Sequence, residues 1–338
     1  SSAGSRIRRR AEPRLVPSRL PDVQHWHGLD AVPPGWGRCV VTIGVFDGVH
    51  RGHAEIIGKA VELASAQGVP SVLLTFVPHP SEVVRPGSHP PVLTTLVRRA
   101  ELVEELGVDV FCALPFTLEF SQMSPAEFAH EALVARLHAS AVIVGENFRF
   151  GHKAAGDVAT LGQLGNAFGF TAHGIPLLRG GETPISATYV RSCVQAGDVA
   201  AATAALGRPH RLDGIVERGD ERGRVLGFPT ANLRTEEWAA VPADGVYAGY
   251  VQRLDEWGRT VPDASLGMAA ISVGTNPTFE VRQRRVEAYV LDFDGDLYGD
   301  GLGVEFVHRL RGMERFDSVD ALVEQMTDDV KQTRALLA

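Results

Sequence analysis

The chain is poor in the features that mark several common protein classes. Its 338 residues include only three cysteines, Cys39, Cys112 and Cys193, which lie far apart and form no disulfide, metal or redox pattern. Two of them lie in apolar runs, where we expect buried structural thiols, and a reducing, cytoplasmic location fits this usage. No apolar stretch reaches the roughly 20 residues that are needed to span a bilayer.

The chain also lacks an excess of positive charge. It has 33 Lys and Arg against 41 Asp and Glu, which gives a formal net charge of −8. This balance argues against general binding to nucleic acid or to a membrane surface. The P-loop pattern G-x-x-x-x-G-K-[ST] is absent, and no G-x-G-x-x-G follows the first expected strand. Two common phosphate-binding loops are therefore excluded.

What the chain does have is enough apolar content, 44% of 338 residues, to bury two cores. The sequence pattern changes near Gly207, which predicts domains over residues 20–206 and 207–338. In the first, strand-like runs alternate with helical patterns, which is typical of a parallel sheet with helices on both faces. The expected strands are Cys39–Phe46, Ser71–Phe76, Val108–Leu114, Ala139–Val144 and Phe170–Ile175.

The second half has shorter strand-like segments between recurring Gly and Pro, which predicts an all-β barrel or sandwich. One helical pattern, from about Ser318 to Leu337, closes the chain. In the first half, a helix is expected to start at Ser124, because Pro125 and Glu127 complete the pattern of a capping box.

The most informative segment is Gly44–His53, which reads G-V-F-D-G-V-H-R-G-H. An apolar run leads into it and helical spacing follows it, so we expect a strand, a glycine-rich turn and a helix start. Backbone N–H groups and the helix dipole make such a junction suitable for an anion. His50 and His53 would there stabilise charge that builds up during phosphoryl or nucleotidyl transfer. A zinc site is one alternative, although no Cys or third His lies nearby, and a chance match is another.

Three more motifs follow in the first half: T-F-V-P-H-P at Thr75–Pro80, V-G-E-N-F-R-F-G at Val144–Gly151 and I-S-A-T-Y-V-R at Ile185–Arg191. With the first segment, they resemble the flavin-nucleotide branch of the HxGH nucleotidylyltransferases. Members of that family join a nucleoside monophosphate to a phosphate acceptor and release pyrophosphate. The resemblance implies a doubly wound α/β domain that adenylylates FMN with ATP to give FAD.

The same resemblance implies roles for single residues. His50 and His53 would act as the catalytic pair, and Asn147 would hold the acceptor phosphate or a metal. Phe148 would line the flavin pocket, or else be a core aromatic residue, and His79 would contribute to the crevice or simply cap its loop. The expected contacts to the ATP phosphates are Gly44, Phe46, Asp47, Gly48, Ser186, Thr188 and Arg191, although Arg191 as an ordinary surface cation is an alternative.

One position departs from the family pattern. Ala187 stands where the family usually has a second serine, so one hydroxyl is missing from the expected phosphate contacts. A hydrogen bond to a charged group is worth roughly 1.5–3 kcal/mol, so this loss would weaken the first site without abolishing it.

Three features of the second half carry chemistry: the glycine-rich Gly219–Asn232, a turn at Gly274–Phe279, and the strand-like Val286–Phe293. The glycines of the first, Gly219, Gly223 and Gly227, would let backbone N–H groups approach phosphates. Thr230 and Asn232 offer hard oxygen ligands suited to Mg²⁺. Glu287 alternates with apolar neighbours and is placed to accept a proton from a substrate hydroxyl, unless it is an outward-facing strand charge.

These features resemble riboflavin kinase, most specifically in G-F-P-T-A-N at Gly227–Asn232. The resemblance implies a Greek-key barrel that transfers the γ-phosphate of ATP to the 5′-hydroxyl of riboflavin. It implies that Thr230 and Asn232 hold Mg²⁺–ATP, that Glu287 is the general base, and that Arg309 and Arg311 belong to the flavin-binding part. The nearby Asp292–Asp296 is expected to be a hairpin turn, because it lacks the spacing of a calcium loop.

Together the halves resemble the bacterial bifunctional riboflavin kinase/FMN adenylyltransferases, which make FMN and then FAD. ATP, riboflavin, FMN and a divalent cation, Mg²⁺, are the ligands that this implies. A kinase with a weakened first half and a non-catalytic flavin-binding protein are the alternatives. Assembly of the chain into a homo-oligomer is compatible with the sequence.

Overall fold

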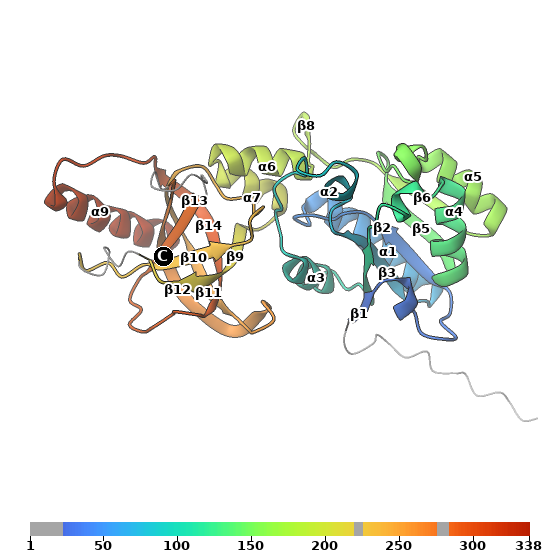
Figure 1. Cartoon of the computed structure of the whole chain (residues 1–338), viewed down its shortest axis with the longest axis horizontal. Helices are drawn as coiled ribbons and strands as arrows, with labels where there is room; N and C mark the ends of the chain where they lie inside the picture. The colour runs from blue at the N-terminus through green and yellow to red at the C-terminus, as the bar shows by residue number, and fades with distance from the viewer. Residues whose placement is uncertain (1–22, 220–225, 276–283) are drawn as a thin grey trace, which may run out of the picture.

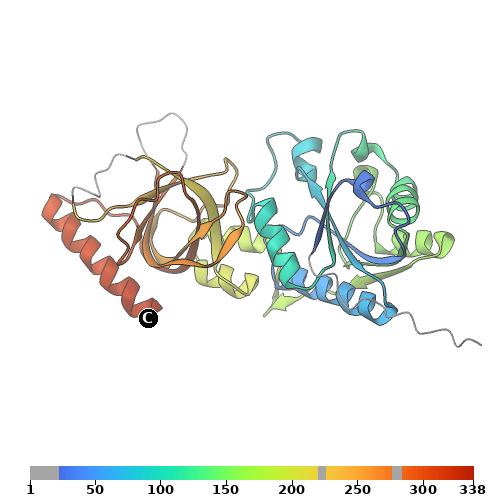
Figure 2. The same cartoon turned by 90° about the horizontal axis from the view of Figure 1, so that it is seen from below.

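The chain forms two domains that lie side by side along the long axis of the molecule (Figure 1). The computed structural model describes residues 23–219, 226–275 and 284–338. A six-stranded sheet lies in the first domain and a closed barrel in the second, as the sequence predicts. Helices α6 (Ala187–Ala196) and α7 (Val199–Leu206) lie between the two (Figures 1 and 2).

The sheet of the first domain is parallel throughout, in the order β1-β4-β3-β2-β5-β6. Its strands are β1 (Gln24–His27), β2 (Cys39–Ile43), β3 (Ser71–Val77), β4 (Val110–Pro115), β5 (Ala139–Gly145) and β6 (Thr171–Ile175). Five of them are the predicted strands. The edge strand β1 was not predicted, because only Trp26 of its four residues is buried and so short a segment carries no clear alternation.

Helices cover both faces of this sheet, which confirms the prediction from the alternating pattern. Successive strand residues point to opposite faces, so Leu73 packs with residues of α1 and α3, whereas Leu74 packs with residues of η3 and α5. The helices are α1 (Arg51–Gln67), α3 (Leu96–Glu105), the π-helix η3 (Ala129–Arg136) and α5 (Val158–Phe168).

Shorter elements fill the connections: η1 (Leu29–Ala31), α2 (Pro80–Val84), η2 (Phe120–Gln122), α4 (Pro125–Phe128), η4 (His152–Ala154), β7 (Arg179–Gly180) and β8 (Thr183–Pro184). Helix α4 begins with the predicted capping box, in which Ser124 and Glu127 each bond the other's backbone N–H. All three cysteines are free and buried.

The second domain is an antiparallel barrel in the closed order β10-β13-β12-β11-β14-β9. Its strands are β9 (His210–Glu217), β10 (Ala231–Thr235), β11 (Gly245–Leu254), β12 (Thr260–Thr275), β13 (Arg284–Val290) and β14 (Gly301–Arg311). The side chains that point inward form a single apolar core that includes Tyr247, Ile271 and Phe306.

The predicted hairpin at Asp292–Asp296 is wrong. Strand β13 pairs with β10 and β12, whereas β14 pairs with β9 and β11, so the segment between them crosses the barrel instead of joining neighbours. Asp and Gly favour a reversal of the chain but do not specify which strands the reversal joins. Asp292 instead forms an ion pair with Arg334 of the last helix, at 2.6 Å.

That helix, α9 (Val319–Leu337), has the predicted bounds, and Ser318 is its N-cap. It packs against the outside of the barrel, at the end far from the first domain (Figures 1 and 2). Within the described residues, no helix combines the length and the apolar character that crossing a membrane would require.

Backbone and side-chain contacts tie the domains together. Val92 of the first domain bonds Trp238 and Ala240 of the second through its N–H and carbonyl, at 2.7 and 2.8 Å. On α3, Glu101 accepts hydrogen bonds from the backbone N–H and the hydroxyl of Thr260. These contacts therefore hold the first domain against the barrel, near the carboxyl edge of the parallel sheet.

Candidate active sites

The turn after β2 places the two predicted histidines at the start of helix α1. His50 is the N-cap residue, and its Nδ1 accepts a hydrogen bond from the His53 N–H at 3.2 Å. The two imidazole rings stack with their centroids 3.6 Å apart, and the ring of Phe46 packs edge-on against His53 at 5.2 Å. The sequence thus folds locally into the strand, turn and helix start that it predicts.

The backbone of this turn is strained. Phe46 and Val49 adopt φ values of 52° and 38°, which residues with side chains rarely do, and Gly48 adopts 77°. A Cβ at Gly48 would lie 2.8 Å from a methyl group of Leu93, so a larger residue there would have to displace Leu93 as well as adopt this φ. Such a turn persists only where surrounding contacts fix it.

Asp47 supplies one set of these contacts. Its buried carboxylate accepts hydrogen bonds from the backbone N–H groups of Leu93 and Thr94, at 3.0 to 3.1 Å. It also pairs with Arg191 at 2.5 Å and with Arg99 at 3.6 Å. Asp47 and Arg191, both expected at the ATP phosphates, therefore bind each other in this structure.

The two histidines are neutral near pH 7. Burial lowers the pKa of His50 to about 4, although the nearby Asp47 carboxylate opposes this, and burial lowers the pKa of His53 well below its usual 6.5. Because the Nδ1 of His50 accepts a hydrogen bond, its proton lies on Nε2, where it can be donated to a ligand. The buried Nδ1 of His53 has no hydrogen-bond partner among the described residues.

The start of helix α6 lies beside the start of α1, since a Cβ on Gly52 would lie 3.5 Å from the carbonyl oxygen of Ile185. Ser186 is the N-cap of α6 and accepts a hydrogen bond from the Tyr189 N–H, and Thr188 is exposed in the first turn. Two helix N-termini therefore converge here, and each favours an anion.

Two further predicted residues follow strands β3 and β5, which lie on either side of β2, at the same edge of the sheet. His79 is the N-cap of α2 and accepts a hydrogen bond from the Ser81 N–H, as the alternative interpretation expected. Burial lowers its pKa to about 4. Asn147 is exposed in the turn after β5, and the ring of Phe148 stacks on Phe150 at 5.5 Å.

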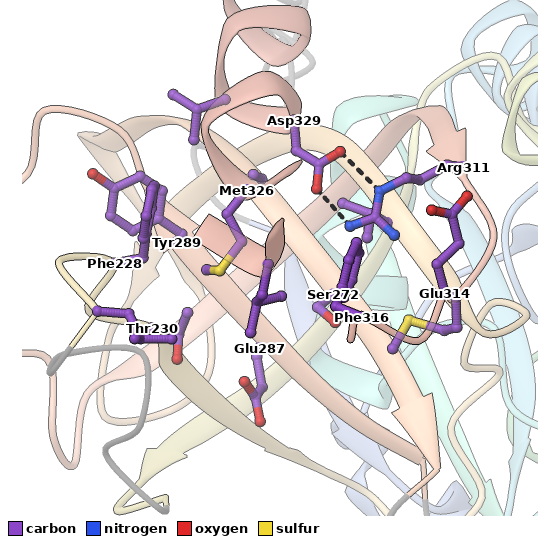
Figure 3. Close-up of a pocket in the computed structure, with 16 residues that line it drawn as sticks. Phe228, Thr230, Ser272, Glu287, Tyr289, Arg311, Glu314, Phe316, Met326 and Asp329 are labelled. Atoms are coloured by element: carbon purple, nitrogen blue, oxygen red, sulfur yellow. Dashed lines mark hydrogen bonds and ion pairs between the residues drawn. The ribbon is translucent and has the colours of Figure 1, made fainter. Parts of the chain in front are cut away.

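The second candidate site is a pocket of about 290 Å³ between the barrel and helix α9 (Figure 3). Its walls are mostly apolar, with polar groups from several elements. The lining residues are Leu226, Phe228, Thr230, Val246, Ala270, Ser272, Glu287, Tyr289, Arg311, Met313, Glu314, Phe316, Leu322, Met326, Asp329 and Val330.

Glu287 reaches this pocket because of its place on strand β13. Its neighbours Val286 and Ala288 point into the barrel core, so the alternation turns Glu287 outward to the pocket. Across the ladder it faces Asn232 of β10 and Ser272 of β12. Figure 3 shows Glu287 and Thr230 at one end of the pocket, and the pair of Arg311 and Asp329 at the other.

The glycine-rich segment is partly described. A Cβ on Gly219 would lie 2.3 Å from the Asn232 amide nitrogen, so the Asn232 side chain lies directly against the Gly219 backbone. Gly227 adopts a φ of 85° just before Phe228, whose ring packs edge-on against Tyr289 at 5.3 Å. Gly223 lies outside the described residues, and so does the predicted turn Gly274–Phe279 except for Gly274 and Thr275, which end strand β12.

The structure separates the two arginines that were expected at the flavin. Arg311 lines the pocket and forms a two-point ion pair with Asp329, at 2.9 and 2.7 Å. Arg309 instead donates to the carbonyl oxygens of Ala196 and Asp244, at 3.2 and 2.9 Å, and so joins the end of α6 to the barrel.

Sequence reasoning did not single out Asp329, although a signal existed. Leu322, Met326 and Val330 form an apolar stripe along α9, and Asp329 lies on the same face, seven residues after Leu322. A carboxylate on an apolar helix face predicts a buried partner, which here is Arg311. Tyr289 and Phe228 were likewise missed, because a strand pattern alone does not separate pocket aromatics from core aromatics.

Comparisons with known proteins agree with both halves. The family model described as FAD synthetase matches residues 33–189, and that described as riboflavin kinase matches residues 206–337. Two relatives named bifunctional riboflavin kinase/FMN adenylyltransferase are similar over most of the chain. The Listeria monocytogenes protein is 35% identical over 88% of this chain and 92% of its own, and that of Pseudomonas fluorescens is 37% identical over 92% and 97%.

A solved structure shares the whole architecture. It is a Streptococcus pneumoniae protein described as a macrolide-efflux protein, with a TM-score of 0.81 and 30% identity over 92% of this chain and 99% of that one. Its description names transport, whereas the similar curated relatives are named for two transferase activities. Because the match covers 92% of this chain, the likeness extends over both domains.

Proposed function

Since the chain belongs to the family of bifunctional riboflavin kinase/FMN adenylyltransferases, and makes FMN from riboflavin and FAD from FMN, we propose how its two sites share this work. The pocket between the barrel and α9 phosphorylates riboflavin. The crevice at the turn after β2 transfers the adenylyl group to FMN. ATP is the second substrate in both reactions.

In the kinase reaction, Glu287 acts as the general base. Its carboxylate accepts the proton of the riboflavin 5′-hydroxyl while that oxygen attacks the γ-phosphorus of ATP, and ADP leaves. The apolar walls around Phe228, Tyr289 and Met326 suit a flat flavin ring, and Asp329 holds Arg311 at the end of the pocket away from Glu287 and Thr230. The observation that carries this assignment is that Glu287 and Thr230 share one end of a mostly apolar pocket.

The donor set fits Mg²⁺. Among the described residues no three His, Cys, Asp or Glu side chains gather into a metal cage, but Mg²⁺ usually takes one or two protein oxygens and completes its shell with phosphates and water. The Thr230 hydroxyl and the Asn232 amide oxygen would hold it. When bound, the ion neutralises charge on the phosphates of ATP.

In the adenylyl transfer, an oxygen of the FMN phosphate attacks the α-phosphorus of ATP, and pyrophosphate leaves. This reaction needs no protein nucleophile, because positioning and charge stabilisation supply most of the rate. The neutral His50 donates its Nε2–H towards the phosphates. The converging N-termini of α1 and α6 add backbone N–H donors, which in α6 begin at Ser186. The stacked His50–His53 pair at a helix N-terminus is the observation that carries this assignment.

The test is a time course of products. The purified chain is incubated with riboflavin, ATP and Mg²⁺, and riboflavin, FMN and FAD are separated by chromatography. FMN should appear first and FAD afterwards, and EDTA should stop both steps. FMN that accumulates without FAD would replace the proposal for the first site by the kinase-dominant alternative.

A further inference from the structure

Arg208 links the barrel domain to the turn that carries the histidines. It follows helix α7 and its C-cap Gly207, and it precedes barrel strand β9. Its guanidinium reaches back into the first domain, where Nη2 donates to the carbonyl oxygen of Gly48 at 2.5 Å and Nη1 donates to that of Val49 at 3.0 Å. The side chain is half-buried by the two domains that it joins.

The two carbonyls belong to the strained turn itself. In a planar trans peptide the C=O and N–H point in opposite directions, so fixing the Val49 carbonyl also fixes where the His50 N–H points. The same restraint sets the plane of the Gly48–Val49 peptide, whose N–H bonds back to the Phe46 carbonyl at 3.1 Å. The orientation of the N-cap His50, and with it the imidazole pair, depends on these two peptide planes.

The turn is thus held from two sides. Asp47 ties one side to Leu93 and Thr94 of the first domain, while Arg208 holds the carbonyls of the other side. A neighbouring contact supports the same junction, since Arg51 donates to the Ala204 carbonyl of α7 at 3.4 Å. Strain at Phe46 and Val49 makes such restraint necessary, because a released turn would relax to more favourable φ values.

We propose that Arg208, which lies within the part of the chain that matches riboflavin kinase, is a positioning residue for the other reaction, adenylyl transfer. It sets the backbone that aims His50 and the first N–H groups of α1 at the ATP phosphates. The inference rests on the proposed role of His50 and His53. It assigns no contact between Arg208 and a substrate.

The experiment compares three variants of the full chain. Arg208→Gln removes the charge and the two-point donor, and Arg208→Lys keeps a cation that can reach one carbonyl. Arg259→Gln is the matched control, because Arg259 also joins the domains, through an ion pair to Glu104 at 2.7 Å, but does not touch the turn. For each variant, kcat and KM are measured for FAD formation from FMN, and the riboflavin kinase rate is measured in the same preparation.

Arg208→Gln should lower kcat for FAD formation about 10²-fold, the size of effect expected from a small misplacement of catalytic groups, with KM values little changed. Arg208→Lys should recover part of this loss. The kinase rate should stay at the wild-type level in both, and Arg259→Gln should leave both reactions unchanged. Kinetics of this kind would separate positioning from stability, because the second active site reports on folding within the same chain.

Three results would overturn the inference: an equal fall of both activities in Arg208→Lys, a rise in KM without a change in kcat, or full FAD formation by Arg208→Gln. If Arg208→Gln does not fold, Arg208→Lys decides alone, by whether its FAD formation falls while its kinase rate holds. His53→Ala is measured in parallel. If that variant still makes FAD, the proposed site is wrong, which is a different failure from a normal rate in Arg208→Gln.

Discussion

The two sites of this molecule are built in opposite ways. At the first, the proposed catalytic pair lies where one short turn enters α1, His50 is buried and His53 half-buried, and contacts on two sides hold a strained backbone. At the second, the groups come from four strands, two connecting loops and helix α9, around a pocket of about 290 Å³. One site is compact and fixed, and the other is roomy and assembled from distant parts of the chain.

The difference follows from what each reaction requires. Adenylyl transfer is promoted by fixed donors aimed at phosphate oxygens, which a restrained helix N-terminus supplies without reorganisation. Phosphorylation of a flavin alcohol requires space for the ring and a base beside the hydroxyl. A parallel sheet provides the first at its carboxyl edge, whereas the outside of a barrel covered by a helix provides the second.

The strongest test of this division is Glu287→Gln. Loss of the general base should lower FMN formation from riboflavin by about 10²–10⁴-fold, since general-base catalysis contributes roughly that much. FAD formation from added FMN should stay unchanged, because Glu287 lies in the other domain. Chromatography of the products measures both. A variant that phosphorylates riboflavin at the normal rate would contradict the assignment of the base.

The reciprocal variant is His53→Ala. Removing a donor from a preorganised site costs about 10²–10³-fold in rate, so FAD formation from FMN should fall by that factor. The riboflavin kinase rate is the internal control and should not change. If both rates fell together, the two sites would be coupled more closely than their separate architectures indicate.

The first domain should be the more sensitive to acid, because it holds more histidines whose pKa is lowered by burial. The pKa of His50 and that of His79 are lowered to about 4 in the first domain, and burial lowers the pKa of His210 in the barrel to about 4 as well. The unfolded chain binds protons to these groups below about pH 6.5, before the folded chain does. The free energy of unfolding should therefore be constant above pH 6.5 on their account, fall between pH 6.5 and 4, and level off below.

Calorimetry at pH 7, 6 and 5 measures this, at roughly 2–4 °C in Tm for each kcal/mol lost. His79→Asn is the informative variant, since asparagine can keep the N-cap hydrogen bond of α2 but does not titrate. Its Tm should depend less on pH than that of the wild-type protein. An unchanged pH dependence would mean that His79 is not a source of the acid sensitivity.

The smallest expected effect is that of Ala187→Ser. Ala187 is the first residue of α6, next to the N-cap Ser186, so a hydroxyl there would add one donor where the two helix starts converge. At about 1.5 kcal/mol, the low end for a hydrogen bond to a charged group, one additional hydrogen bond to a phosphate would raise FAD formation about tenfold. If FAD formation is unchanged, the missing hydroxyl gives no reason to regard the first site as weakened.

Much of the fold was predictable because its signals are local. The runs Ser71–Phe76 and Ala139–Val144 became strands, Ser124 caps its helix as expected, and the last helix covers its expected span. The turn at Gly44–His53 likewise has a sequence that specifies its own shape. The hairpin predicted at Asp292–Asp296 was wrong because turn-forming residues indicate where the chain reverses but not which strands the reversal joins.

The contacts that organise the sites were not predictable in the same way. Arg208 and Gly48 are 160 positions apart, and Asp47 and Arg191 are 144 apart. Neither pair leaves a periodic pattern in the sequence, because each contact is set by how the domains and α6 pack. Arg311 with Asp329 is closer, at 18 positions, and there the unusual place of a carboxylate on α9 did offer a hint.

The closed barrel and the open sheet also differ in what they expose to other molecules. Each of the six barrel strands has a hydrogen-bonded neighbour on both sides, so its backbone offers no template for another chain. The parallel sheet ends in two edges, β1 with four residues and β6 with five. Strand-to-strand aggregation of concentrated or heated protein would begin at these edges, and their short length limits how firmly such contacts can form.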